Sequence, residues 1–277
     1  MSSPVFGKSK PAFGKSKPAF GGFSMIVVCD MGYKMRDTRY EIQAALVMTL
    51  LVLALPVKTG AYEPTENYET RRSQGWILRV NRQFLQEDAE LANKVLRHLK
   101  HQLYQITRAV PPKALARLQE IPIWIERAHP RHPCMCYHIS ADWLREHDMN
   151  PEKAGAVEIA NANNFLAWTN DQPWMVLHEL SHAYHHKVLG HDHPEIKAAY
   201  ERAKASKTYE KVLHINGKIE RHYALANDQE YFAEMTEAYF GTNDFFPFVR
   251  AELKQHDPQM FELLGKLWEK RPKAALP

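Results

Sequence analysis

Residues 44–57 form a continuous apolar run, AALVMTLLVLALPV, without a charged side chain. Arg36 and Arg39 precede the run, and Lys58-Thr59-Gly60-Ala61 follow it. A helix of this length, at about 1.5 Å per residue, does not span a bilayer core of about 30 Å. A basic flank, a short apolar centre and a small residue at the end are typical of a secretory signal peptide. We therefore predict a signal peptide at about 36–61 and a secreted mature chain; an uncleaved signal anchor and a buried helix are the alternatives.

From residue 62 onward the hydrophobic pattern has first the period of strands and then that of helices. Alternating or continuous apolar stretches predict strands at 76–80, 121–126, 156–160 and 164–168. Apolar positions three and four residues apart predict helices at 88–108 and 113–119, and again from residue 171 onward between loops. Residues 62–75 and 127–138 are predicted loops. Strands first and helices last favour one α+β domain over residues 62–277, with a small mixed sheet.

Composition separates this domain from the segment before it. Residues 6–20 read FGKSKPAFGKSKPAF, two copies of a seven-residue unit that cannot bury enough apolar surface to fold, so we predict disorder. Residues 1–61 hold eight Lys/Arg against three acids, a net charge of +5, whereas the whole chain of 277 residues has +4. The remaining residues are close to neutral, which argues against a nucleic-acid-binding body.

An HExxH sequence at residues 178–182 lies inside one predicted helix, which Asp171 is expected to cap. His178 and His182 are four residues apart, so they share a helical face at about 5–6 Å between Cβ atoms, which suits two imidazoles on one Zn²⁺. Glu179 lies about 100° around the helix, where it can accept a proton from a zinc-bound water. An exposed His-rich helix is the alternative, because further histidines follow the motif.

A catalytic zinc needs a third protein ligand and one open position. The metzincin class places a third His six residues after the second, but Val188 stands there, so that class is excluded. A later helix offers Glu230, Glu234 and Glu237. Glu230 and Glu234 share a face, so either could bind the metal while the other braces a ligand imidazole. A capping role for Glu230, with Asn227 as the N-cap, is the alternative.

The segment HELSHAYHHKVLG, followed about 40 residues later by Tyr223-ALANDQ-Glu230-YFAE, resembles the catalytic domain of anthrax lethal factor and its relatives. Those proteins are gluzincin-type zinc endopeptidases of zincin fold. The resemblance covers about residues 120–240, and it is closest to uncharacterised secreted members of that clan, which share a stretch like NDFFPFVRAEL (243–253). It implies that Glu230 is the third zinc ligand, that Glu234 stands behind a ligand, and that Tyr223 faces the scissile carbonyl.

The expected chemistry is hydrolysis of a peptide bond in a peptide or protein substrate. A zinc-bound water would be activated by Glu179 as the base, and the hydroxyl of Tyr223 would hold the developing negative charge. The resemblance also implies an open sheet edge for an extended peptide, which we expect in strand 156–160 or 164–168. A non-catalytic, zinc-stabilised extracellular binding module and a membrane-anchored form of the domain are the alternatives. We predict no nucleic-acid partner.

A second group of metal-binding residue types lies within ten residues. It consists of His129, His132, Cys134, Cys136 and His138. A second metal site is one interpretation; thiols without a metal, or a cysteine that pairs with another chain, are the others. A bridge between the two cysteines is awkward, because an i,i+2 pair in an extended chain separates its Cα atoms by about 6.5–7 Å.

Overall fold

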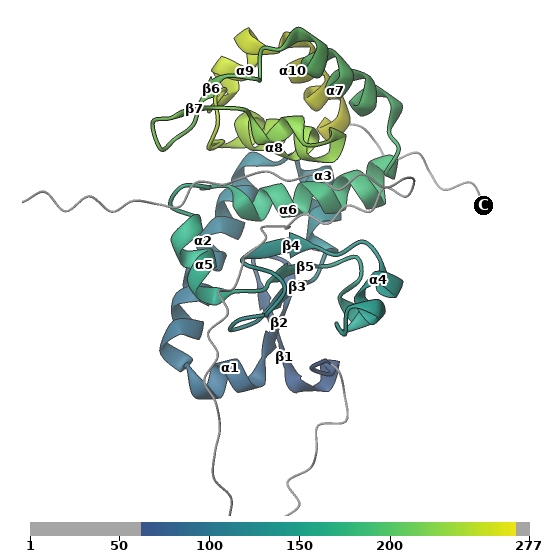
Figure 1. Cartoon of the computed structure of the whole chain (residues 1–277). Helices are drawn as coiled ribbons and strands as arrows, with labels where there is room; N and C mark the ends of the chain where they lie inside the picture. The colour runs from purple at the N-terminus through teal and green to yellow at the C-terminus, as the bar shows by residue number, and fades with distance from the viewer. Residues whose placement is uncertain (1–61, 270–277) are drawn as a thin grey trace, which may run out of the picture.

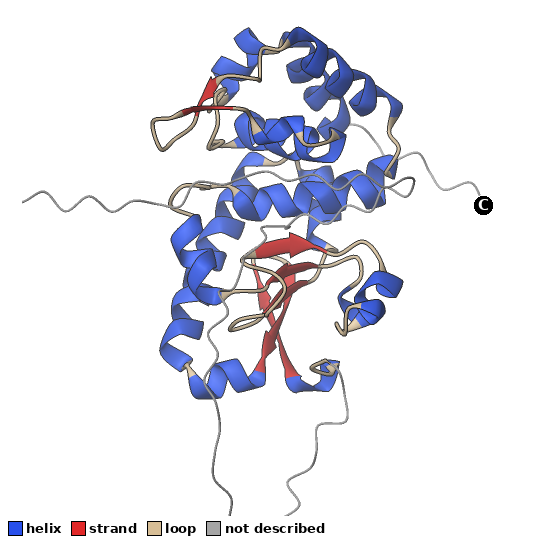
Figure 2. Cartoon of the chain, in the orientation of Figure 1, coloured by secondary structure: helices blue, strands red, loops and turns tan. Residues whose placement is uncertain are grey.

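The computed structural model describes residues 62–269. The signal peptide and the disordered segment predicted for residues 1–61 lie outside the described residues. Between residues 62 and 269, no helix is both long enough and apolar enough to cross a membrane. Helices accompany one five-stranded mixed sheet and one two-stranded sheet, so the α+β class predicted from the sequence is confirmed (Figure 2).

The mixed sheet occupies the lower half of the molecule in the view of Figure 1. Its strands are β1 (Tyr68–Ser73), β2 (Trp76–Asn81), β3 (Ile123–Ile125), β4 (Met135–Tyr137) and β5 (Val157–Ile159), in the order β1-β2-β3-β5-β4. β2, β3 and β5 run parallel, whereas β1 pairs antiparallel with β2 and β4 pairs antiparallel with β5. Within the described chain, β4 has a strand neighbour on one side only, which makes it an edge strand.

Helix α6 (Met175–Tyr184) crosses the molecule between the sheet and a helical half, and it contacts β4 on one side and α8 on the other (Figure 1). The helices before it are α1 (Arg82–Glu87), α2 (Ala89–Ala109), α3 (Pro112–Gln119), α4 (Ala141–Glu146) and α5 (Ala162–Trp168). The helical half contains α7 (Pro194–Ser206), α8 (Asp228–Phe240), α9 (Arg250–His256), α10 (Pro258–Glu269) and the hairpin of β6 (Val212–Leu213) and β7 (Ile219–Glu220). Short helical turns are η1 (Thr65–Asn67), η2 (Pro151–Lys153), the π-helical η3 (His185–Gly190) and η4 (Tyr223–Leu225).

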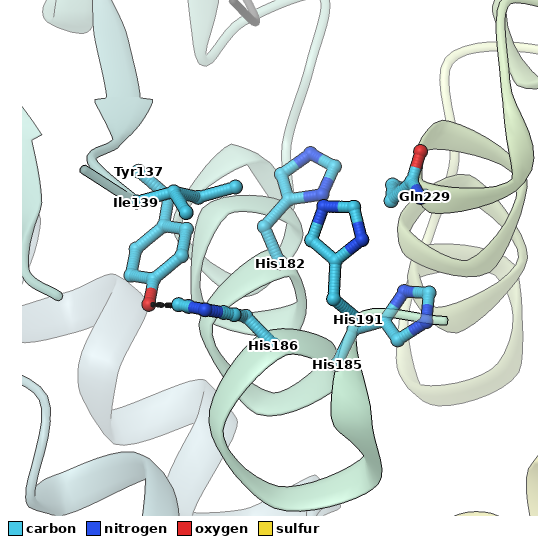
Figure 3. Close-up of a pocket in the computed structure, with 7 residues that line it drawn as sticks. All are labelled: Tyr137, Ile139, His182, His185, His186, His191 and Gln229. Carbon is cyan, nitrogen blue, oxygen red and sulfur yellow. Dashed lines mark hydrogen bonds between the residues drawn. The ribbon is translucent and has the colours of Figure 1, made fainter. Parts of the chain in front are cut away.

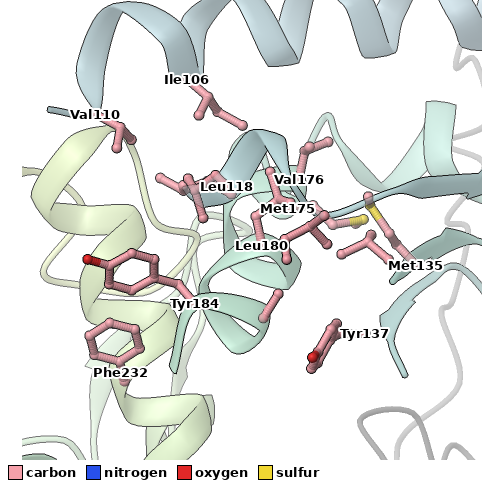
Figure 4. Packing of buried hydrophobic residues seen from close by; sticks show 14 of the residues in the cluster. Ile106, Val110, Leu118, Met135, Tyr137, Met175, Val176, Leu180, Tyr184 and Phe232 are labelled. Atoms are coloured by element: carbon pink, nitrogen blue, oxygen red, sulfur yellow. The ribbon is translucent and has the colours of Figure 1, made fainter. Parts of the chain in front are cut away.

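One face of the sheet, called here the front face, is apolar and packs against α6. The strand register aligns two buried rows on it: Leu78, Ile123, Val157 and Tyr137 in one, and Val80, Ile125, Ile159 and Met135 in the other. Met175, Val176 and Leu180 of α6 lie in the same cluster, and α2 adds the stripe from Val95 to Ile106 that the sequence predicts (Figure 4). Each fully buried aliphatic side chain contributes about 1.5–3 kcal/mol. This apolar contact fixes α6 relative to β4.

The opposite face, called here the back face, carries the alternate residues of the same strands and is polar at its centre. Cys136, Glu158 and Trp124 are neighbours across β4, β5 and β3. The buried ammonium of Lys153 donates to Glu158 Oε1 at 2.5 Å and to Glu126 Oε1 at 2.7 Å. Burial alone would raise the pKa of Glu158, but Lys153 and His138 hold it well below its usual range. These two partners therefore favour the ionised form of the Glu158 carboxyl although it is buried.

Three sequence predictions are wrong, each for a local reason. Residues 68–73 are the strand β1 and not a loop; their polar sequence hides a hairpin that closes through Gln74 and Gly75, both with positive φ. Residues 164–168 belong to helix α5 and not to a strand, because Asn161 caps the helix by accepting from the backbone N–H of Asn164 at 3.0 Å. The predicted loop 127–138 contains β4, whose three residues are buried on both faces.

Candidate metal centre

Helix α6 carries the HExxH motif, and every one of its residues is buried. It begins at Met175 after Trp174, without a side-chain cap, so the cap expected from Asp171 is wrong. At its C-terminal end the chain continues as the π-helical turn η3, which Gly190 ends with a positive φ. Such π-turns inside helices are frequent at functional sites, because they shift the side chains of one helical face.

Helix α8 supplies the carboxylates that face α6. Its N-cap is Asn227, the residue named in the capping alternative, whose side chain accepts from the backbone N–H of Glu230 at 2.8 Å, while the carboxylate of Glu230 lies against His178. Phe232 and Met235 are fully buried on the core side of α8. Glu230, Glu234 and Glu237 are spaced four and three residues apart, so they follow one face of the helix. That face meets the histidines of α6.

Three donor atoms converge between the two helices. His178 Nε2 lies 3.0 Å from His182 Nε2 and 3.1 Å from Glu230 Oε2, and His182 Nε2 lies 3.4 Å from the same oxygen. Two nitrogen or oxygen ligands at about 2.0–2.1 Å from one tetrahedral Zn²⁺ lie about 3.3 Å apart. The side chains are nearly inaccessible to solvent, so an ion here would be well enclosed on the protein side. These three residues fit a single zinc ion.

Two further carboxyl groups stand behind His178. Glu237 Oε1 is 2.7 Å from His178 Nδ1, whereas Glu234 Oε1 is 3.6 Å from it. Glu234 accepts from Asn243 Nδ2 at 3.0 Å through its other oxygen. A carboxylate on Nδ1 fixes the ring tautomer and leaves Nε2 as the ligand atom. The structure thus gives Glu237 the shorter contact, where the resemblance implied Glu234.

Burial dominates the protonation of this cluster. It raises the pKa of Glu237 to about 7, against the lowering effect of His178. Burial, Asp244 and Glu237 together raise the pKa of Glu234 well above its usual range. Burial lowers the pKa of His178, but the carboxylates of Glu230 and Glu237 outweigh it and raise that pKa. These raised pKa values favour the protonated forms of Glu234 and Glu237. Burial would raise the pKa of Glu230 as well, but His182 and His178 outweigh it and lower that pKa to about 2, so the negative charge of the cluster lies on Glu230 beside the two imidazoles.

Glu179 lies beside the three donor atoms and between α6 and β4. Its carboxylate accepts from the backbone N–H of Tyr137, while within residues 62–269 its Oε2 has no hydrogen-bond partner although it is buried. Burial raises the pKa of Glu179 to about 8, and the nearby charge of His178 opposes the rise. A carboxyl group with a pKa near neutrality can both accept and release a proton at physiological pH.

A small pocket opens next to His182 (Figure 3). His185 and His186 project into it from η3, and Gln229 closes it from the side of α8. The hydroxyl of Tyr137 and His186 Nδ1 are 2.8 Å apart, which links η3 to the edge strand. Three of the histidines that follow the motif, His185, His186 and His191, therefore line a pocket and are not spread over an exposed helix.

Tyr223 is the first residue of η4, which packs against α8. Its side chain is 44% exposed, in contrast to the buried His178, Glu179, His182 and Glu230. The residue before it, His222, is fully buried, and its Nδ1 lies 3.8 Å from Glu234 Oε2. The sequence pattern therefore brings one exposed phenol to the end of the helix that carries Glu230.

No protein-family model, curated protein or solved structure matches the chain.

Proposed function

We propose that this protein is a secreted zinc metallopeptidase of the gluzincin type, with a zincin-like fold. The observation that carries the proposal is the triangle of His178 Nε2, His182 Nε2 and Glu230 Oε2, with sides of 3.0, 3.1 and 3.4 Å, beside the buried carboxyl group of Glu179. Two imidazoles and one carboxylate are a donor set of catalytic zinc sites, which keep a further position open. Secretion rests on the signal-peptide pattern of residues 36–61.

In this proposal each residue has a separate task. His178, His182 and Glu230 would hold Zn²⁺, which when bound lowers the pKa of a coordinated water to about 7 and polarises a carbonyl. Glu179 accepts the proton of the attacking water at its carboxylate and returns it to the leaving amine. Tyr223, whose exposed side chain can meet a substrate, donates its hydroxyl to the oxygen of the tetrahedral intermediate.

The edge strand β4 is the proposed place for the substrate backbone. It contacts α6, and on one side it has no strand neighbour within residues 62–269. An extended peptide can add there as a further strand, which holds a scissile bond close to the helix that carries the base. The expectation that strand 156–160 is this edge is wrong, because β5 lies between β3 and β4.

A digest of a peptide library by the full-length protein and by Glu179→Gln tests the function, with zinc measured in both. We expect wild type to cleave peptides and to hold zinc, and Glu179→Gln to hold zinc while its turnover falls by about 10²–10⁴-fold. Glu90→Gln, on the exposed surface of α2, is the control and should cleave like wild type.

Two results would contradict the proposal. Zinc binding without any cleavage by wild type would identify a non-catalytic binding module. Loss of zinc from Glu179→Gln would make Glu179 a metal ligand and leave the reaction without its base.

A further inference from the structure

A second cluster of metal-binding side chains lies behind β4. His132, Cys136 and His138 are each at most 4% exposed, and one donor atom from each lies within 4.8 Å of the other two. Cys136 Sγ and His138 Nε2 are 3.6 Å apart. A thiolate at about 2.3 Å and an imidazole nitrogen at about 2.0–2.1 Å from one tetrahedral Zn²⁺ lie about 3.5 Å apart. The spacing therefore suits a shared ion as well as it suits a weak hydrogen bond.

His132 provides an independent observation. Both of its ring nitrogens are buried, and neither has a hydrogen-bond partner within residues 62–269. Its ring lies 5.4 Å from that of His138, between centroids, so it is turned toward the cluster. A buried polar group without a partner costs about 1–3 kcal/mol. A ligand bond from one nitrogen of His132 would remove part of that cost.

The buried carboxyl groups next to the cluster also favour a cation there. Glu126 and Glu158 share the single ammonium of Lys153. A divalent ion with one thiolate ligand would add one positive charge beside these two carboxyl groups. Glu158 Oε2 lies 2.6 Å from His138 Nε2 as a hydrogen-bond partner; an ion on that nitrogen would replace this bond and could take the same oxygen as a fourth ligand. Buried charges are stable only when they are paired in this way.

We propose that His132, Cys136 and His138 form a second metal site, specific for a thiophilic divalent ion such as Zn²⁺, on the back face of the sheet. Two imidazoles and a thiolate are borderline and soft donors, which select zinc over magnesium or calcium. The site joins the loop before β4, through His132, to the strand itself, through Cys136. It has no part in the hydrolysis; it holds the edge strand from behind.

Cobalt substitution separates this site from the front one, because only a sulfur ligand produces the thiolate-to-cobalt charge-transfer band in the near ultraviolet. The front donors are nitrogen and oxygen atoms alone. We expect the reduced full-length protein to take up two equivalents of Co²⁺ and to show the thiolate band. Cys136→Ser should lose the band and one equivalent, and His182→Ala should lose one equivalent but keep the band.

The matched control is Cys134→Ser. Cys134 stands two residues from Cys136, yet its Sγ faces Met175 Sδ on the front side at 3.5 Å, so this variant should keep both equivalents and the band. Cys29→Ser controls for the remaining cysteine of the chain. If Cys136→Ser does not fold, the milder variant His132→Gln takes its place, and it should also lose one equivalent of Co²⁺. A wild-type spectrum without the band, or a band that persists in Cys136→Ser, would overturn the proposal.

Discussion

Two clusters of metal-binding side chains with different chemistry lie on opposite sides of β4. On the front side, His178, His182 and Glu230 offer nitrogen and oxygen, a buried carboxyl group stands beside them, and a pocket opens next to His182. On the back side, His132, Cys136 and His138 offer two imidazoles and a thiol, next to the two carboxylates that share Lys153. An open position with a base suits catalysis, whereas an enclosed site with sulfur suits a structural ion. In these two proposals, the type of ligand and its access to solvent, more than the number of donor atoms, distinguish the catalytic site from the structural one.

The largest effect is expected from a substitution that removes the buried ammonium from the back face. Lys153→Met removes the ammonium that two buried carboxylates share, so we expect the free energy of unfolding to fall by about 3–5 kcal/mol. Urea denaturation followed by circular dichroism measures it. Lys197→Met is the control, because Lys197 pairs with Asp192 on the exposed surface, so its loss should change the free energy of unfolding far less than Lys153→Met does. Equal losses in the two variants would mean that the back face needs no buried cation.

The next effect belongs to the front face alone. Tyr223→Phe removes a hydroxyl that we place on the developing negative charge, so kcat should fall by about 10- to 10³-fold. Zinc content and the cobalt thiolate band should stay as in wild type, because Tyr223 is in neither donor set. Steady-state kinetics on a cleaved library peptide measures the change. An unchanged kcat would reduce Tyr223 to a structural residue.

The smallest expected effect is on zinc affinity, and it distinguishes the two carboxyl groups behind His178. Glu237→Ala should weaken zinc binding at the front site by about 10- to 100-fold, because the contact that orients the imidazole is lost. Glu234→Ala should weaken it less, since Glu234 lies 3.6 Å from Nδ1 and Glu237 lies 2.7 Å from it. Competition with a chromophoric chelator measures both affinities. The reverse order would restore Glu234 as the residue that orients the ring.

The sequence predicts the elements whose side-chain pattern repeats within one segment, and it misses those that depend on pairing with a distant strand. The stripe of α2 and the i,i+4 histidines of α6 are visible because one helix contains all of their positions. Glu237 is also within reach of such reasoning, since it continues the face of Glu230 and Glu234 by three residues. By contrast, β4 has only three residues and both of its faces are buried, so it shows no alternation. Its existence depends on β5 and α6, which the local pattern does not contain.

The two cysteines illustrate the same limit. Residues two apart on a regular strand share a face, which would place both thiols together. The carbonyl of Cys134 instead accepts from two consecutive N–H groups, those of Ala160 and Asn161, at 2.7 and 3.2 Å. This irregular pairing at the start of β4 lets Cys134 face α6 while Cys136 faces the back. Between Cys134 and Cys136 the structure forms no disulfide.

The alternation of β4 makes the length of the loop before it a chemical constraint. A deletion of one residue between Arg127 and Pro133 would shift the register of β4 by one position. Cys136 and His138 would then face α6, and Met135 and Tyr137 would face away from it. A thiol would then lie on the side of β4 that faces the proposed zinc site of His178 and His182, where it would compete with water for the proposed ion. The selectivity of the two proposed metal sites would therefore depend partly on the number of residues in a loop that carries none of the front ligands.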